Sequence, residues 1–247
     1  MRVFGLIGYP LKHSFSEKYF TEKFRREKIS DAKYFLFPIS SLSEFHSLRQ
    51  RYSFAGLNVT IPFKQSIISH LDELDEKAAI AGAVNTIKFL KKDNLVLTKG
   101  YNTDIDGFEA LLAACPLPKD VSALILGTGG ASKAVAYVLK QKNIAYHFVS
   151  RNPDNETVFS YNTLSGKDIA EHELIINTTP LGMFPDIESF PAIPYGSVSK
   201  NHLCIDLVYN PEKTVFMARC EQQQALVVNG LEMLWVQAEK SWEIWNQ

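Results

Sequence analysis

The segment that most limits what this chain can fold into is ALILGTGGASKAVAYVL, at residues 123–139. Residues 123–126 form a continuously apolar run, which is typical of a strand buried on both faces of a parallel sheet. A glycine-rich turn follows this run and leads into a helix that we expect from about residue 131 to residue 140. A buried strand that passes through such a turn into a helix indicates a doubly wound α/β domain.

The glycines of this turn also have a chemical consequence. Because Gly127, Gly129 and Gly130 lack side chains, their backbone N–H groups can approach a pyrophosphate at the start of the helix. The pattern departs from Gly-x-Gly-x-x-Gly, since Ser132 takes the third glycine position, but Ala131 and Ser132 are small enough for close packing. A tight turn without a ligand is the alternative. The context of strand, turn and helix favours a dinucleotide.

The end of the next expected strand, residues 145–149, indicates which dinucleotide is bound. An NAD-specific site usually has an acidic residue here, which accepts a hydrogen bond from the ribose 2′-hydroxyl. In this chain the corresponding residues are Ser150 and Arg151, and the next acidic residue is Asp154. A guanidinium suits a 2′-phosphate through its charge and its planar set of donors. A solvated arginine at the start of a loop is the alternative, and we predict NADP(H).

The rest of the chain alternates between short apolar runs and helix-like segments, which predicts two α/β domains. One is expected at residues 1–103 plus 230–247, with a mixed, mainly parallel sheet, and the other at residues 104–229, with a Rossmann-like fold. Ser16 could N-cap a helix that carries Phe20 and Phe24, and Asp72 could open another helix. A hairpin is expected around residues 92–94, and a final helix over residues 231–245. Further strands are expected at residues 3–7, 34–37, 57–60, 84–90, 174–177, 203–207 and 226–228.

Composition excludes several classes of function. The net charge of −1 provides no basic field for nucleic acid, and no apolar run approaches the roughly 20 residues that cross a membrane. The three cysteines are scattered and the six histidines lack a metal-ligand spacing, so we expect no metal and no disulfide framework. The N-terminus is broken too early by Gly and Pro for a signal peptide. We therefore expect a cytoplasmic protein that acts on small molecules.

Polar residues in the first half gather at expected strand ends. GLNVTIPFK contains Asn58, Thr60 and Lys64, GAVNT contains Asn85, and YNTDIDG contains Asp104 just before a helix. Each has an ordinary interpretation as a cap, a turn residue or a surface lysine. Because strand ends of an open α/β sheet face one crevice, their joint occurrence favours a polar binding site.

The motifs GYPLKHSFS, GLNVTIPFK, GAVNTI, YNTD, GTGGAS, IINTTPLGM, DLVYNP and NGLEMLWVQA resemble the shikimate dehydrogenase family in order and spacing. The resemblance covers residues 8–238. It implies the reversible, NADPH-dependent reduction of 3-dehydroshikimate to shikimate, a step toward chorismate and the aromatic amino acids. It also implies an active site in the cleft between the two domains, and a monomer or a homodimer.

The resemblance implies a role for individual positions. Lys64 corresponds to the catalytic lysine, and Asp104 would share the catalytic role and bind the ring hydroxyls. For the substrate, the positions implied are Ser14 and Ser16 at the carboxylate, Asn85 at the ring hydroxyls, Thr60 and Gln237 at the ring or the carboxylate, and Asn58 and Tyr209 as further substrate positions. For the cofactor, they are Gly127, Gly129, Gly130, Ala131, Ser132, Ser150, Arg151, Thr178, Met183 and Gly230.

Chemistry supports Lys64 as the proton donor, because an ammonium stabilises a developing alkoxide and then protonates it. The chain departs from the family after Ser16, where Glu17 replaces the common proline and Phe20–Thr21 replace a His-Asn pair. Two alternatives remain. One is a quinate/shikimate dehydrogenase of broader specificity, because an added hydroxyl is not strongly rejected by every pocket. The other is a catalytically silent homologue that senses the ligand.

Overall fold

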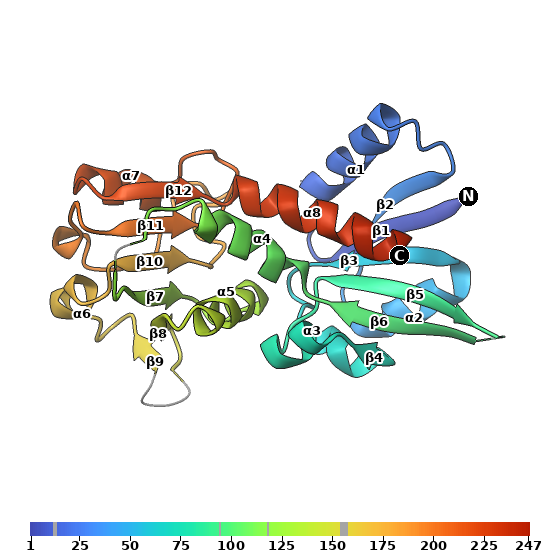
Figure 1. The fold of residues 1–247 in the computed structure, drawn as a ribbon, viewed down its shortest axis with the longest axis horizontal. Coiled ribbons are helices and arrows are strands. Elements are labelled where there is room, and N and C mark those ends of the chain that lie inside the picture. The colour runs from blue at the N-terminus through green and yellow to red at the C-terminus, as the bar shows by residue number, and fades with distance from the viewer. Residues whose placement is uncertain (12–13, 94, 118, 154–157) are drawn as a thin grey trace. The chain divides into compact units, whose positions relative to one another are not determined.

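The computed structural model describes residues 1–11, 14–93, 95–117, 119–153 and 158–247, which form two compact units. The first unit consists of Met1–Thr103 and Gln237–Gln247, and the second of Asp104–Val236. Each unit contains one six-stranded sheet (Figure 1). The return of the chain to the first unit was expected at residue 230, and the contacts place it within the last helix, at Gln237.

The sheet of the first unit has the strand order β2-β1-β3-β5-β6-β4. Strands β2, β1 and β3 are parallel, β5 is antiparallel to both β3 and β6, and β4 is parallel to β6. The predicted mixed, mainly parallel sheet is confirmed. The strands are β1 (Arg2–Gly8), β2 (Ala32–Pro38), β3 (Phe54–Val59), β4 (Glu73–Leu74), β5 (Thr86–Lys92) and β6 (Leu95–Tyr101), and the helices are α1 (Phe15–Arg26), α2 (Leu42–Arg51), α3 (Glu76–Ala81) and the 3₁₀ helix η1 (Ser66–His70).

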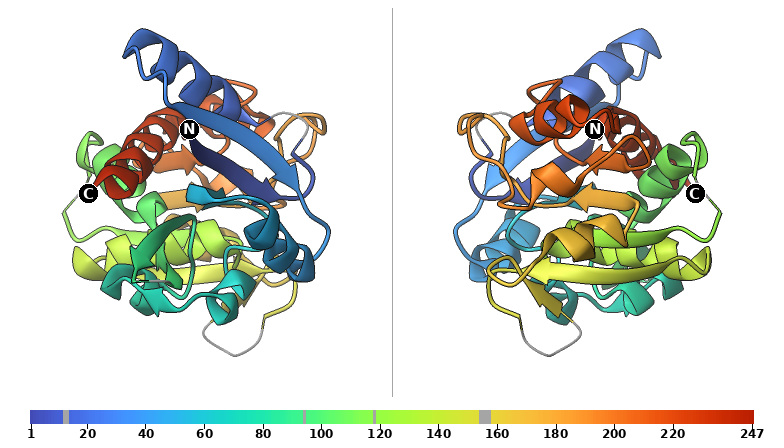
Figure 2. Two further views of the ribbon diagram at one scale, coloured as in Figure 1. Left: turned by 90° about the vertical axis from the view of Figure 1, so that its right-hand side faces the viewer. Right: turned by 90° about the vertical axis from the view of Figure 1, so that its left-hand side faces the viewer.

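Aromatic side chains fill one face of this sheet, under α1 and α8 (Leu231–Asn246). Figures 1 and 2 show these two helices side by side over this face. Phe20 of α1 stacks on Tyr34 of β2 at 4.6 Å between ring centroids, and Trp245 of α8 lies 4.9 Å from Phe4 of β1. Large rings such as these remove more apolar area from water than other side chains, so they hold both helices on the sheet.

Two expectations for the first unit are wrong. The N-cap residue of α1 is Ser14, and Ser16 lies in the first turn of the helix. Asp72 does not begin a helix, because its carboxylate accepts hydrogen bonds from the backbone N–H and the hydroxyl of Thr98, both at 2.7 Å, and thus ties this segment to β6. Asp75 caps α3 instead, by accepting from the N–H of Lys77.

The expected hairpin is present as β5 and β6, which pair from Thr86–Tyr101 to Lys92–Leu95. Asn94, at the expected turn, lies outside the described residues.

The sheet of the second unit is parallel throughout, with the order β12-β11-β10-β7-β8-β9. The Rossmann-like fold is therefore confirmed. The chain adds β8 and β9 on one side of β7 and then places β10 on its other side, and such reversal points are where open α/β sheets bind ligands. The strands are β7 (Ser122–Leu126), β8 (Ala145–Ser150), β9 (Val158–Ser160), β10 (Leu174–Asn177), β11 (Leu203–Asp206) and β12 (Leu226–Asn229), and the helices are α4 (Thr103–Ala113), α5 (Gly130–Gln141), α6 (Gly166–Ala170), α7 (Val215–Gln222) and the 3₁₀ helix η2 (Tyr195–Ser197).

Gly56 provides a test of how closely α8 approaches the first sheet. A Cβ at Gly56 would lie 2.2 Å from the indole Nε1 of Trp245, which donates a hydrogen bond to the carbonyl of Ile87. Gly56→Ala should therefore lower the free energy of unfolding by about 1–3 kcal/mol, the usual cost of overpacking, as measured by urea denaturation. Gly196→Ala is the control, because a Cβ there would meet nothing within 4 Å. Equal midpoints for the two variants would contradict this packing.

Candidate active site

The glycine turn of the second unit leaves the start of α5 open to a ligand. Gly127 has a φ of +105°, and a Cβ there would lie 3.0 Å from the hydroxyl of Thr178, so a side chain is excluded. Gly129 is the N-cap residue, and a Cβ there would meet nothing within 4 Å. The hydroxyl of the buried Ser132 donates to the carbonyl of Gly129 at 2.6 Å and fixes the turn. An N-cap without a side chain leaves the first N–H groups of the helix able to bind an anion such as a pyrophosphate.

The last residue of β8 and the residue after it differ in their contacts. The Ser150 hydroxyl accepts from the N–H of Asn152 at 3.2 Å and donates to its carbonyl oxygen at 3.1 Å, so it closes the turn. Arg151 is exposed, and its charge lies close enough to Tyr161 to act on that phenol. Burial nevertheless raises the pKa of Tyr161 to about 12. Asp154, the next acidic residue, lies outside the described residues. In the sequence, Arg151 directly follows the end of β8, where an NAD-specific site usually has an acid.

Three other residues expected at the cofactor lie in the second unit. Thr178, after β10, donates from both its N–H and its hydroxyl to the carbonyl of Leu126, at 3.0 and 2.7 Å, and links the ends of β10 and β7. Met183 follows Gly182, whose φ is +87°, and is 38% exposed. At Gly230 a Cβ would lie 2.3 Å from the carbonyl oxygen of Leu207, so glycine permits a close approach of two backbone segments there.

A buried aspartate holds the loops at the end of this sheet, and sequence analysis missed it. Asp206, at the end of β11, accepts hydrogen bonds from the Asn177 amide at 2.9 Å, the N–H of Val208 at 3.0 Å and the Thr214 hydroxyl at 2.5 Å. Burial raises its pKa to about 6, although these three hydrogen bonds favour the carboxylate. The motif DLVYNP contains Asp206, and a polar residue that ends an apolar strand was the available signal.

In the first unit, the motif residues gather at one edge of the sheet. Ser14 and Ser16 follow the carboxyl end of β1, and Thr60 and Lys64 follow that of β3. Because β5 is antiparallel to β3, the residues before β5 also lie at this edge, where Asn58 pairs with Thr86 and Thr86 with Tyr101 at the end of β6. The backbone carbonyl of Lys64 accepts from the N–H of Val84 at 2.7 Å, which joins the loop after β3 to the start of β5. The four motifs of the first half therefore converge.

Asn58 is 5% exposed and forms hydrogen bonds within the unit. Its Oδ1 accepts from the hydroxyl of Tyr34 at 2.8 Å, and its Nδ2 donates to the hydroxyls of Ser241 at 3.0 Å and Thr86 at 3.2 Å. Ser16 also forms a hydrogen bond with the hydroxyl of Tyr34, whose pKa is raised by burial. Hydrogen bonds at both Oδ1 and Nδ2 therefore fix the side-chain amide of Asn58.

Asn85 is 3% exposed and belongs to the same network. Its Oδ1 accepts from the N–H of Thr103 at 2.7 Å, and its Nδ2 donates to the Thr103 hydroxyl at 2.9 Å. The hydroxyl of Ser241 forms hydrogen bonds with those of Thr86 at 2.8 Å and Thr103 at 3.1 Å. The network joins β3, β5, the start of α4 and α8. Sequence analysis missed Tyr34, Thr86, Thr103 and Ser241, because a hydroxyl within an apolar strand or helix gives no signal of its partners.

The remaining expected site residues are divided between the units. Gln237 of α8 belongs to the first unit, and its carbonyl accepts from the hydroxyl of Ser241 at 2.9 Å. Asp104, in the first turn of α4, is buried, and Tyr209, after β11, is half-buried; both belong to the second unit. Among the described residues there is no group of three or more His, Cys, Asp or Glu that could hold a metal ion. None of the helices in the described ranges is long and apolar enough to span a membrane.

A parallel sheet with a glycine turn at a helix N-terminus defines the chain as a dinucleotide-binding α/β protein. The family model for the "Shikimate dehydrogenase substrate binding domain" matches residues 6–87. A shikimate dehydrogenase (NADP(+)) of Methanococcus maripaludis is 35% identical over 262 residues, which cover 99% of this chain and 92% of that protein. The chain belongs to the shikimate dehydrogenase family, as the motifs predicted.

Solved structures agree with this assignment. The shikimate 5-dehydrogenase of Thermus thermophilus, in complex with NADP(H) and shikimate, has a TM-score of 0.83 and 28% identity, covering 99% of this chain and 93% of that one. The quinate dehydrogenase of Corynebacterium glutamicum, in complex with NAD, has a TM-score of 0.84 and 25% identity, with coverage of 99% and 93%.

The raised pKa of Asp206 predicts a pH dependence of stability. Between its ordinary pKa near 4 and its folded pKa of about 6, the folded protein retains a proton that the unfolded chain has lost. The contribution of Asp206 to stability should therefore fall as pH rises through this window, by up to about 3 kcal/mol. In Asp206→Asn this contribution is absent, so the unfolding free energy of wild type minus that of the variant should decrease from pH 4 to pH 6.5 in urea titrations. Asp186→Asn, at an exposed site, should give a constant difference. A constant difference for Asp206→Asn as well would contradict the prediction.

Proposed function

We propose that this chain catalyses the reversible, NADPH-dependent reduction of 3-dehydroshikimate to shikimate, a step toward chorismate and the aromatic amino acids. The observation that carries the proposal is the similarity to an NADP(+)-dependent shikimate dehydrogenase over nearly the whole of both chains. The convergence of the motif residues at one edge of the first sheet supports it. We further propose that the enzyme acts in the cytoplasm, as a monomer or a homodimer.

In this proposal each unit binds one of the two small molecules. The first unit binds the substrate, and the family model for a substrate binding domain lies within it. The second unit binds NADP(H), with the pyrophosphate at the start of α5. A Cβ at Gly129 would meet nothing within 4 Å, so the space beside this glycine is open. A pyrophosphate fits there, and a side chain at this position would occupy the same space. Thr178 and Met183 would lie toward the nicotinamide, and Arg151 would bind the 2′-phosphate.

For the substrate, each polar group of the ring has a proposed partner. Ser14 and Ser16 bind the carboxylate, because hydroxyls and the N–H groups of a helix start favour an anion. Asn85 and Asp104 bind ring hydroxyls. Further contacts come from Thr60, Tyr209 and Gln237. Asn58 is held by Tyr34 and Ser241, and it contributes by keeping the site rigid.

The chemical step needs a hydride at the ketone carbon and a proton at its oxygen. Bound NADPH would supply the hydride. The Lys64 ammonium stabilises the developing alkoxide and then gives it the proton. The carboxylate of Asp104 orients this lysine or the adjacent ring hydroxyl. In the oxidation of shikimate, the neutral lysine takes the proton back.

A broader quinate/shikimate dehydrogenase is the second candidate, because the quinate dehydrogenase of C. glutamicum has the same fold. Quinate has one ring hydroxyl more than shikimate and lacks its ring double bond, and some pockets tolerate an added hydroxyl. The deciding experiment measures kcat/KM for shikimate and quinate, each with NADP+ and NAD+. The proposal expects shikimate with NADP+ to be preferred, and no oxidation of shikimate with either cofactor would refute it.

Lys64→Ala should lower kcat for shikimate oxidation by about 10²–10⁴-fold, the range for a general acid–base group. The KM for shikimate should change less, since the carboxylate contacts remain. Lys91→Ala, at an exposed lysine of β5, is the matched control and should be unaffected. A near-normal kcat for Lys64→Ala would remove Lys64 from the chemistry.

Arg151→Ala should raise the KM for NADPH by about 3–10-fold, because the lost hydrogen-bonded ion pair is exposed to solvent. The KM for NADH should stay nearly constant, since NADH has no phosphate at this position. Both cofactors are compared in both proteins at fixed ionic strength. Equal losses for the two cofactors would show that Arg151 supports the turn or the adenine instead of reading the phosphate.

A further inference from the structure

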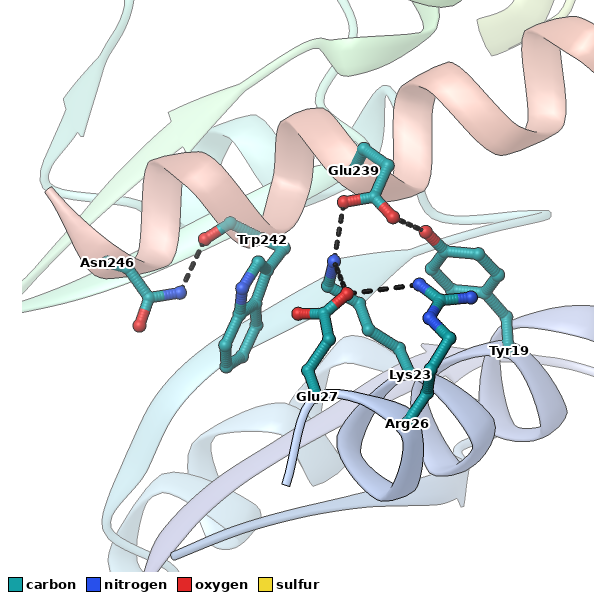
Figure 3. A network of polar contacts seen from close by, with 7 residues as sticks. All are labelled: Tyr19, Lys23, Arg26, Glu27, Glu239, Trp242 and Asn246. Atoms are coloured by element: carbon teal, nitrogen blue, oxygen red, sulfur yellow. Dashed lines mark hydrogen bonds and ion pairs between the residues drawn. The ribbon is translucent and has the colours of Figure 1, made fainter. Parts of the chain in front are cut away.

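Three side chains join α1 to α8 in the first unit, and we call them the α1–α8 clamp: Tyr19, Lys23 and Glu239 (Figure 3). One carboxylate oxygen of Glu239 accepts from the Lys23 ammonium at 2.6 Å, and the other accepts from the Tyr19 hydroxyl. The Lys23 ammonium also donates to Glu27 at 2.9 Å, one turn further along α1. Glu239 is therefore held at both oxygens by two residues of the facing helix.

Burial makes the pairing of Lys23 obligatory. Its side chain is 5% exposed, while that of Glu239 is 43% exposed. A charge that is removed from water needs partners of opposite charge, and Lys23 has two carboxylates. Burial and the hydrogen bond to Glu239 also raise the pKa of Tyr19, so this phenol stays a donor. Loss of Glu239 would leave a buried ammonium with less compensation and a buried hydroxyl without this acceptor.

The clamp lies close in sequence to the residues of the proposed carboxylate site on both helices. On α1, Tyr19 stacks on Phe15, with 5.4 Å between ring centroids and 24° between the planes, and Phe15 stands between Ser14 and Ser16. On α8, Glu239 follows Gln237 by two residues. Tyr19 therefore contacts both Phe15 in the first turn of α1 and Glu239 on α8.

We propose that Tyr19, Lys23 and Glu239 are positioning residues that set the two serine hydroxyls against Gln237 for the carboxylate of the substrate. The inference rests on the proposed function of Ser14 and Ser16. A displacement of about 1 Å in such a group is enough to weaken productive binding strongly.

The clamp is separable from the packing of the helices. Phe20 lies 5.4 Å from Trp245 and Phe24 lies 5.1 Å from Trp242, between ring centroids, so aromatic contacts hold α1 on α8 without the polar groups. Loss of the clamp should therefore leave the helices packed and allow the first turn of α1 to shift. This separates a positioning effect, seen in the KM for shikimate, from a general loss of structure.

The experiment compares Glu239→Ala, Glu239→Gln and Tyr19→Phe with Glu243→Ala as the matched control. Glu243 lies one turn further along α8 and forms an exposed pair with Lys240 at 2.8 Å. Glu239→Ala should raise the KM and the Kd for shikimate about tenfold, and Tyr19→Phe about threefold, as expected for a charged and a single hydrogen bond. Glu239→Gln should fall between wild type and Glu239→Ala, because its amide oxygen still accepts from Lys23. In all variants kcat and the KM for NADP+ should stay within about twofold of wild type, and Glu243→Ala should match wild type throughout.

Two results would refute the positioning role of the clamp. One is a KM for shikimate in Glu239→Ala no higher than in Glu243→Ala, and the other is an equal rise in the KM for shikimate and for NADP+. If Glu239→Ala does not fold, Tyr19→Phe decides, and an unchanged KM refutes the proposal. The double variant Ser14→Ala, Ser16→Ala separates the two levels of inference. An unchanged KM in this double variant refutes the carboxylate site and the clamp together. A raised KM there, with an unchanged KM in the clamp variants, refutes the clamp alone.

Discussion

The first unit depends on one buried set of hydrogen bonds, in which Asn58 and Asn85 meet Thr86, Thr103 and Ser241. Polar groups at such depth are costly unless they are paired, so the network fixes the positions of β3, β5, the start of α4 and α8 together. Every motif residue proposed for the substrate in this unit lies on these elements or on the loops and helix beside them. Of these five residues Asn85 is the one proposed to bind the substrate, so the rigidity of the site comes mainly from Asn58, Thr86, Thr103 and Ser241.

In the second unit, glycines and one buried carboxylate position the loops at the end of the sheet. Gly127 and Gly129 permit the tight turn before α5. The carboxylate of Asp206 accepts hydrogen bonds from the side chains of Asn177 and Thr214 and from the N–H of Val208. The raised pKa of Asp206 shows that the burial cost is not fully offset by these donors. The loops proposed to meet the nicotinamide are thus anchored by Asp206, a carboxyl group whose charge changes near pH 6.

The sequence was most informative where a signal is local. Apolar runs, the expected hairpin and the glycine turn predicted the strands of both sheets except β4 and β9, and they predicted the fold of the second unit. It was least informative where a residue far away in the sequence determines the local structure. Asp72 resembled a helix start, but Thr98 holds its carboxylate. The N-cap of α1 was expected at Ser16, but it is Ser14. The hydroxyl of Ser241 and the clamp of Tyr19 and Glu239 join segments more than 150 residues apart, which no local pattern reveals. The short strands β4 and β9, of 2 and 3 residues, also lacked a clear pattern.

The discontinuity of the first unit has a consequence for biosynthesis. Trp245 packs against Phe4 and Gly56, yet it lies in the segment Gln237–Gln247, which is translated after the whole second unit. The sheet of this unit emerges early from the ribosome, but the part of its aromatic face beneath α8 stays uncovered until the segment Gln237–Gln247 has been made. The second unit lies wholly between these segments and can close its own core before then, since domains fold as units during synthesis. The order in which the chain is made is therefore opposite to the order in which its two cores are completed.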